Sequence, residues 1–214
     1  MSRHAVLAGA TGLIGCHLLS GLLSEPRYTK ITALSRRPLM ASDPRLQVLL
    51  TDFGDLDAHA ASLAADDVYC ALGTTLARAG SREAFAHVDH DLVMALAGAA
   101  YRAGSRQFLL VSAVGSSANS PSFYSRTKGR VEEDLRALGF ESLHIIRPSL
   151  LLGERTESRP MEAVAQKLAP ALGLITRGFL ARYRPVTAAE VARAMIACAL
   201  SDQRGVQVHE APFQ

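Results

Sequence analysis

Short apolar runs alternate with longer stretches of helical periodicity along most of this chain. The longer stretches repeat apolar residues every three or four positions, as Leu18, Leu19 and Leu22 do. The short runs have strand length and span residues 5–8, 30–35, 46–51, 67–71, 107–112 and 143–147, with a last one at 206–209. Strands that alternate with helices form parallel sheets through right-handed crossovers. The pattern predicts a three-layer α/β/α fold with a doubly wound parallel sheet.

The periodic stretches begin and end at capping residues. Ser81 and Thr187 are typical N-caps, and Gly104 is a typical stop. Besides the helix after the first strand, helices are predicted over residues 55–64, 81–101, 123–138 and 188–200. The alternation lapses over residues 150–185, where glycine and proline recur. We therefore expect a single domain, residues 1–214, with residues 150–185 as an insertion in it.

A glycine-rich segment joins the first strand to the first helix. Gly9, Gly12 and Gly15 recur at three-residue spacing. In a dinucleotide-binding turn such glycines permit the bend, let the backbone approach a diphosphate and let the helix pack on its strand. The helix start offers unpaired N–H groups to phosphate. An ordinary turn with a helix cap is the alternative. The dinucleotide interpretation predicts a Rossmann-like site made of Gly9, Thr11, Gly12, Leu13, Ile14 and Gly15.

Composition narrows the class of protein. With 214 residues, the chain can bury a core without needing disulfides or metal. A net charge of +3 is too small to indicate nucleic acid, and no apolar run approaches the ~18 residues of a membrane helix. No nucleic acid and no integral membrane segment are expected. The three cysteines lie far apart in the sequence and form no Cys-x-x-Cys motif, which favours a reducing compartment. We therefore expect a cytoplasmic protein.

Basic residues follow the second strand, where a Rossmann fold binds the adenosine ribose. Sites that prefer NAD place an acidic side chain there for the 2′-hydroxyl. This chain has Ser35, Arg36 and Arg37, and guanidinium groups form charge-assisted hydrogen bonds with a 2′-phosphate. Two solvated loop arginines are the alternative. The sequence predicts that NADP(H) is the preferred cofactor, with NAD(H) as the alternative.

Two further strand ends supply candidate cofactor contacts. Asp52 and Phe53 follow the third strand as candidates for holding adenine, and a helix-capping Asp beside a core Phe is an equal alternative. Small and hydroxyl-bearing residues follow the fourth strand, where they are candidates to contact the middle of the cofactor. A turn that ends in a helix N-cap would have the same composition and is the alternative. These are Leu72, Gly73, Thr74 and Thr75.

A Tyr/Lys pair begins the helix after the fifth strand. Tyr124 and Lys128 are four residues apart, so both side chains project from one helix face. A phenol ionises too weakly to act as a base at neutral pH, but a nearby ammonium stabilises the phenolate. Such a spacing is common by chance and is usually a solvated pair. Its place after a complete phosphate-binding start makes Tyr124 a candidate acid or base and Lys128 its tuner and ribose anchor.

Together these stretches resemble the short-chain dehydrogenase/reductase superfamily, in its extended and atypical branches. The resemblance covers nearly the whole chain and includes LLVSAVGSS from residue 109 and IIRPS from residue 145. The runs ALGTT, FAHVDHD and GERTESRP, from residues 71, 85 and 153, are similar to the Tat-interacting-protein group of NADP-binding atypical members. The resemblance implies NADP(H) binding by a Rossmann-like domain, cofactor contacts at Arg147 and Pro148, and an insertion on the substrate side.

One departure from the superfamily concerns the serine that bonds the substrate carbonyl and the Tyr phenol. Ala113 or Val114 occupies its usual place after the fifth strand, and Ser112, Ser116 or Ser117 are the available substitutes. We take Ser112 as the candidate donor. Cofactor binding is thus better supported by the sequence than catalysis.

The helix predicted over 81–101 carries a second departure and a weak metal signal. Asp89 lies where the superfamily often has an Asn that organises a proton-relay water. His87 and His90 alternate with Asp89 and Asp91, but two His three residues apart without a third ligand are more often a solvated face. No metal is expected.

Two functions of different classes remain open from the sequence. The first is an NADP(H)-dependent oxidoreductase that moves hydride to or from a carbonyl or enone, with Tyr124, Lys128 and Ser112 as catalytic residues. The second is an NADP(H)-binding, redox-sensing regulatory or scaffold protein with little catalysis. The first implies a small-molecule carbonyl substrate, the second a protein partner, and the sequence leaves a homodimer open.

Overall fold

The structure is a computed structural model, and it describes residues 2–152, 184–201 and 203–213. The strands are β1 (Arg3–Ala8), β2 (Tyr28–Ser35), β3 (Leu46–Leu50), β4 (Asp67–Cys70), β5 (Gln107–Val111), β6 (Ser142–Arg147), β7 (Leu151–Leu152), β8 (Val186–Thr187) and β9 (Gly205–Glu210). The helices are α1 (Leu13–Ser24), α2 (Ala60–Leu63), α3 (Leu76–Ala79), α4 (Arg82–Ala86), α5 (Leu92–Arg102), α6 (Phe123–Leu138) and α8 (Ala188–Ala199), with a 3-10 turn η1 (Asp57–His59) and a π-helical turn η2 (His87–Asp91).

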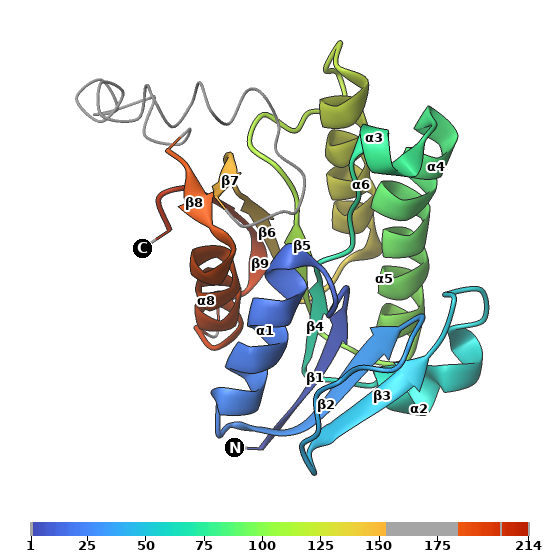
Figure 1. Ribbon diagram of the computed structural model, residues 1–214, viewed down its shortest axis with the longest axis vertical. Coiled ribbons are helices and arrows are strands. Elements are labelled where there is room, and N and C mark those ends of the chain that lie inside the picture. The colour runs from blue at the N-terminus through green and yellow to red at the C-terminus, as the bar shows by residue number, and fades with distance from the viewer. Residues whose placement is uncertain (1, 153–183, 202, 214) are drawn as a thin grey trace.

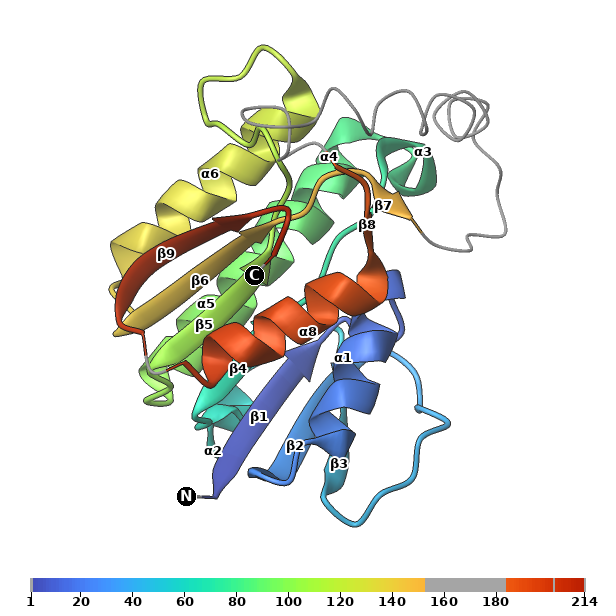
Figure 2. The same ribbon diagram turned by 90° about the vertical axis from the view of Figure 1, so that its left-hand side faces the viewer.

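Seven of the strands form one parallel sheet in the order β3-β2-β1-β4-β5-β6-β9, with helices on both faces (Figure 1). Helices α1 and α8 cover one face, and α5 and α6 lie on the other (Figure 2). Strand β1 is buried on both faces because it lies at the centre: Ala5 and Leu7 join the core beneath α1 and α8, and Val6 and Ala8 join the core beneath α5 and α6. The predicted three-layer, Rossmann-like fold is confirmed.

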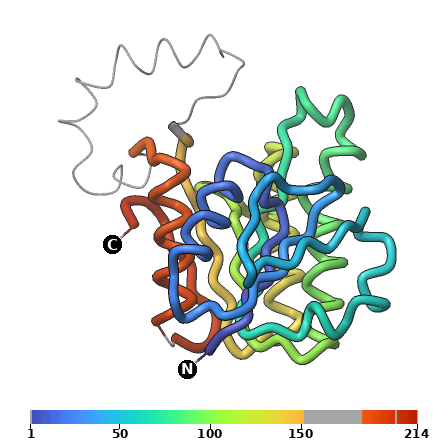
Figure 3. Tube along the Cα trace, turned by 60° about the horizontal axis from the view of Figure 1, so that its bottom comes forward, coloured from blue at the N-terminus to red at the C-terminus, as the bar shows by residue number. Residues whose placement is uncertain are grey.

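Helices from the two ends of the chain pack side by side. Figure 3 shows α1 in blue against α8 in red. Gly21 makes this approach possible, because a Cβ there would lie 2.6 Å from Cδ1 of Ile196. Thr187 and Glu190 begin α8 with reciprocal backbone hydrogen bonds, which satisfy two N–H groups at the helix start. The N-cap predicted at Thr187 is thus present.

The helix predicted over residues 81–101 contains a π-helical turn. Ser81 caps α4 as expected, and the chain continues through η2 into α5. A π turn adds one residue to a helical turn and is common at functional sites. Here Asp89 is turned inward and is 1% exposed, whereas the side chains of His87 and Asp91 are about 60% exposed. No local sequence pattern predicts such a turn.

Other differences from the expected elements are small. The helix predicted over 55–64 is reduced to η1 and α2, and the four-residue helix α3 was not expected. Strands β7 and β8 form a separate parallel pair, also not expected. Most of the insertion predicted over 150–185, with the run GERTESRP, lies outside the described residues. No helix in the described part of the chain has the length and apolar character needed to cross a membrane.

Candidate functional site

The strand order reverses between β1 and β4, and the glycine loop lies at this reversal. In doubly wound sheets, ligands bind at the carboxyl ends of the strands beside such a point. Gly9 has a φ of 90°, and a Cβ on it would lie 2.5 Å from the carbonyl oxygen of Ala71, just after β4. A Cβ on Gly15 would lie 1.9 Å from the carbonyl oxygen of Gly9. Both positions therefore require glycine for backbone packing, as the spacing predicted.

Bare backbone and an uncapped helix start face outward from this loop. Thr11 and Gly12 are exposed, and the N–H of Gly12 donates to the oxygen of Gly9 at 2.9 Å. Gly12 is the N-cap of α1 but supplies no capping side chain, and the first turn has no acidic residue. The first N–H groups of a helix have no partner within it, and the helix dipole favours an anion there. Leu13 and Ile14 at this helix start thus fit a diphosphate group.

The basic pair lies at the end of β2, the neighbour of β1. Ser35 is buried and accepts a hydrogen bond from the N–H of Arg37 at 3.3 Å. Arg36 and Arg37 are exposed, and within the described residues neither guanidinium has an ion-pair or hydrogen-bond partner. Two unpaired cations beside the glycine loop fit a ligand phosphate.

Asp52 and Phe53 are arranged differently from each other. Asp52 is exposed, and its Oδ1 accepts from the N–H of Gly54 at 2.9 Å. Phe53 has a φ of 71°, unusual for a residue with a side chain, and it is 6% exposed within the core beneath α5. Its ring is held by the protein core, and the adenine contact remains a prediction for this turn.

The loop after β4 packs against the Tyr/Lys helix. A Cβ on Gly73 would lie 3.3 Å from Oδ1 of Asp89 and 3.7 Å from Nζ of Lys128. The N–H of Thr74 donates to Oδ2 of Asp89 at 2.8 Å, and Thr75 caps α3 by accepting from the N–H of Arg78. The structure therefore brings the fourth strand's loop together with Lys128, while Leu72 is half-buried beside it.

Lys128 and Asp89 form a buried ion pair. Nζ of Lys128 lies 2.8 Å from Oδ1 of Asp89, and the two side chains are 5% and 1% exposed. Oδ1 accepts no aligned hydrogen bond within the described residues, so the contact is mainly electrostatic. Burial works against the ammonium, but the Asp89 carboxylate and the Tyr124 phenol outweigh it and raise the pKa of Lys128. Lys128 is therefore a fixed cation whose charge Asp89 largely neutralises.

Tyr124 lies one helical turn before Lys128 at the start of α6. It is 37% exposed, and its ring centroid is 5.5 Å from that of Phe85 on α4. The phenol thus has one side against the protein and one side open to a ligand. The structure brings Tyr124 and Lys128 to the same carboxyl edge of the sheet as the glycine loop.

Ser112 belongs to a buried polar network instead of facing Tyr124. Its Oγ donates to Oε1 of Glu132 and lies 3.1 Å from Oγ of Ser116. Glu132 is 1% exposed and pairs with Arg147 at 2.6 Å, a contact that raises the pKa of Arg147. Arg147 also donates to Glu210 at 3.3 Å, and Pro148 after it is buried. Sequence reasoning missed Glu132, whose position four residues after Lys128 on one helix face was the available signal.

Comparisons with known proteins agree with this geometry. A family described as NAD(P)H-binding matches residues 9–202, nearly the whole chain. This chain belongs to that NAD(P)H-binding family. A protein named fmp52, mitochondrial, of Emericella nidulans is 41% identical over 80% of this chain and 77% of its own length. The FMP52 protein of Eremothecium gossypii, also named mitochondrial, is 38% identical over 94% of this chain and 90% of its own. The predicted membership of the atypical short-chain dehydrogenase/reductase branch is confirmed.

A solved structure shares the fold of this chain. The Bordetella bronchiseptica enzyme WbmH in complex with NAD+ superposes with a TM-score of 0.71, at 15% identity, over 98% of this chain and 75% of its own. The similarity shows a shared fold, and it does not distinguish NADP from NAD as the cofactor.

The expected cytoplasmic location is wrong on these comparisons, because both relatives carry mitochondrial names. All three cysteines are free, which is typical of reducing compartments. Cysteine usage does not distinguish one reducing compartment from another, so it could not support the cytoplasm in particular.

Proposed function

We propose that this protein is an NADP(H)-dependent oxidoreductase that transfers hydride to or from the carbonyl or enone group of a small molecule. The observation that carries the proposal is the meeting of the bare glycine loop with Tyr124 and Lys128 at one edge of the sheet. The loop fits a diphosphate, and the Tyr/Lys pair fits proton transfer beside it.

Three sets of groups at this edge of the sheet would hold the cofactor. Backbone N–H groups of Leu13 and Ile14, in the first turn of α1, would bind the diphosphate. Arg36 and Arg37 would bind the 2′-phosphate. Their exposed guanidinium groups, which have no partner in the described part of the chain, favour NADP(H) over NAD(H). Lys128 would donate to the nicotinamide ribose from its fixed position against Asp89.

In the reducing direction, the chemistry that bound NADPH would supply is a hydride for the carbonyl carbon. The phenol of Tyr124 gives its proton to the carbonyl oxygen and is reprotonated from water. Lys128 stabilises the transient phenolate electrostatically, and this effect is moderated by Asp89. Ser112 would orient the carbonyl if its hydroxyl turned from Glu132 toward the ligand.

Cofactor preference is tested by calorimetry with Arg36→Ala. A lost charge-assisted hydrogen bond of about 1.5–3 kcal/mol weakens NADPH binding about 10–150-fold, with little change for NADH. Arg130→Ala, an exposed arginine on α6, is the matched control for the loss of one charge. Equal NADPH affinities of Arg36→Ala and wild type would remove the 2′-phosphate assignment.

Catalysis is tested separately by NADPH oxidation with a panel of carbonyl compounds. Tyr124→Phe keeps the ring contact with Phe85 and should abolish turnover while NADPH still binds. Turnover that survives in Tyr124→Phe would exclude Tyr124 as the proton donor.

A second candidate is an NADP(H)-binding, redox-sensing regulatory protein with a protein partner. Two observations favour it: the Ser112 hydroxyl is engaged by Glu132, and Asp89 neutralises Lys128. Tight NADPH binding without turnover, together with a partner affinity that depends on the cofactor, would support it. Robust carbonyl reduction with no partner recovered would exclude it.

A further inference from the structure

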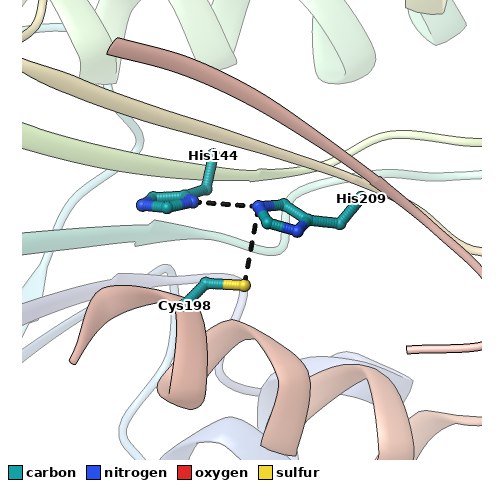
Figure 4. Close-up of side chains that lie close together, drawn as sticks. All are labelled: His144, Cys198 and His209. Atoms are coloured by element: carbon teal, nitrogen blue, oxygen red, sulfur yellow. Dashed lines mark hydrogen bonds between the residues drawn. The ribbon is translucent and has the colours of Figure 1, made fainter. Parts of the chain in front are cut away.

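Two histidines and a cysteine meet on the face of the sheet that α8 covers. His144 lies on β6, His209 on the neighbouring edge strand β9 and Cys198 on α8 (Figure 4). In the register of the two strands, His209 pairs with Ile146, so both imidazoles project from the same face. One ligand atom from each of the three residues lies within 4.8 Å of the others.

Hydrogen bonds fix the tautomer of His144. Oγ of Ser142 donates its one proton to the carbonyl oxygen of Gln203 at 2.7 Å. It must therefore accept from Nε2 of His144, which lies 3.0 Å away. Nδ1 of His144 is left with a lone pair, and it faces Nε2 of His209 at 3.0 Å. A hydrogen bond that orients the distal ring nitrogen is a common support for a metal-binding imidazole.

The spacing of the ligand atoms is close to that of a tetrahedral metal site. Zinc–nitrogen bonds of about 2.05 Å and zinc–sulfur bonds of about 2.3 Å give ligand separations of about 3.3 Å for N···N and about 3.6 Å for N···S. Two of the three separations are close to these values, at 3.0 Å between the imidazole nitrogens and 3.6 Å between Sγ of Cys198 and Nε2 of His209, and all three ligand atoms lie within 4.8 Å of one another. Small side-chain rotations would place all three around one ion.

Burial also suits the site to metal binding. His144 is fully buried, on the protein side of the site. Cys198 and His209 are half-buried, which leaves solvent a route to a fourth coordination position. Two imidazoles with a thiolate match a borderline-soft ion, whereas magnesium and calcium require oxygen ligands.

We propose that His144, Cys198 and His209 bind a zinc ion, with water at the fourth position. The ion would fasten edge strand β9 and helix α8 to β6. The site lies on the opposite face of the sheet from α6, which carries Tyr124 and Lys128, so it is separate from the proposed hydride-transfer site. The sequence analysis expected no metal because it considered only His87 and His90. It did not consider His144, Cys198 and His209 together, because His144 and Cys198 are 54 positions apart and no short ligand motif joins the three.

Cobalt(II) tests the proposal on the full, tag-free chain after treatment with a chelator. The wild type should bind a single equivalent and develop both the visible bands of tetrahedral cobalt and a sulfur-to-cobalt charge-transfer band. Zinc should displace the cobalt. At a zinc concentration about 100-fold above its Kd, the Tm should rise by about 5–10 °C.

Matched variants separate this site from other thiols and histidines. Cys198→Ser should lose the charge-transfer band and at least tenfold in affinity, whereas Cys16→Ser, an exposed cysteine on α1, should change neither. His209→Gln, at a half-buried position, should lose the tetrahedral spectrum while the chain stays folded by circular dichroism. A wild type without the charge-transfer band, or a band that survives in Cys198→Ser, would overturn the proposal.

Discussion

Replacing Asp89 by Asn should destabilise the protein strongly through Lys128. The ammonium lies 2.8 Å from Oδ1, and both side chains are almost fully buried. At an effective dielectric constant of 20 their attraction is about 6 kcal/mol, and much of it offsets the cost of taking both charges out of water. Removal of one partner leaves the other charge buried and unpaired, which costs about 3–5 kcal/mol.

The substitution isolates this charge because Asn can still accept the N–H of Thr74, which now donates to Oδ2 of Asp89 at 2.8 Å. For a chain of this length the loss corresponds to a Tm decrease of about 6–20 °C. Urea unfolding and calorimetry measure it, without cofactor. The double variant Asp89→Asn/Lys128→Met removes the unpaired charge and should recover most of the loss. A single variant within about 1 kcal/mol of wild type, or a double variant as unstable as the single one, would refute the reasoning.

Three further predictions concern the glycine loop, a helix interior and a pH-dependent contact. Gly15→Ala should lower the Tm and abolish NADPH binding, because its Cβ would lie 1.9 Å from a backbone oxygen; fluorescence titration of NADPH measures the latter. In Gly98→Ala, within α5, the added Cβ would contact only the flexible end of the Arg102 side chain. Because alanine favours the helix, the unfolding free energy measured in urea should rise by up to about 1 kcal/mol, and a decrease would contradict this packing. Partial burial lowers the pKa of His90, but the hydrogen bonds to Asp134 and Asp91 outweigh this effect, so the pKa is raised. This contribution is present below the unfolded pKa of about 6.5 and is lost as the pH rises through the folded pKa. Asp134→Asn should therefore cost at most about 1 kcal/mol near pH ~5.5 and nothing near pH ~9, and a cost independent of pH would exclude the His90 contact.

The strands and the longer helices were predictable because their signals are local. Strand β1 is buried on both faces, so an uninterrupted apolar run sufficed, and α6 was predicted with the bounds that it has. The glycine spacing similarly identified two positions at which backbone packs on backbone.

The contacts that complete the candidate site were not predictable from local pattern. Asp89 and Lys128 are 39 residues apart, and their pairing depends on a π-helical turn that turns Asp89 inward. Ser112 was chosen by its distance from a strand end, but its hydroxyl partner is set by Glu132 on a different element. Such partners are fixed by tertiary packing, which sequence periodicity does not encode.

The packing of α1 against α8 has a consequence for how the chain matures. During synthesis, the helix that starts at the glycine loop emerges early, but the surface around Gly21 is covered only when Ile196 arrives. A nascent chain that ends before residue 188 therefore leaves an apolar side of α1 open to water. Nucleotide affinity should accordingly appear late in translation, together with the final helix, and not when the loop itself is made.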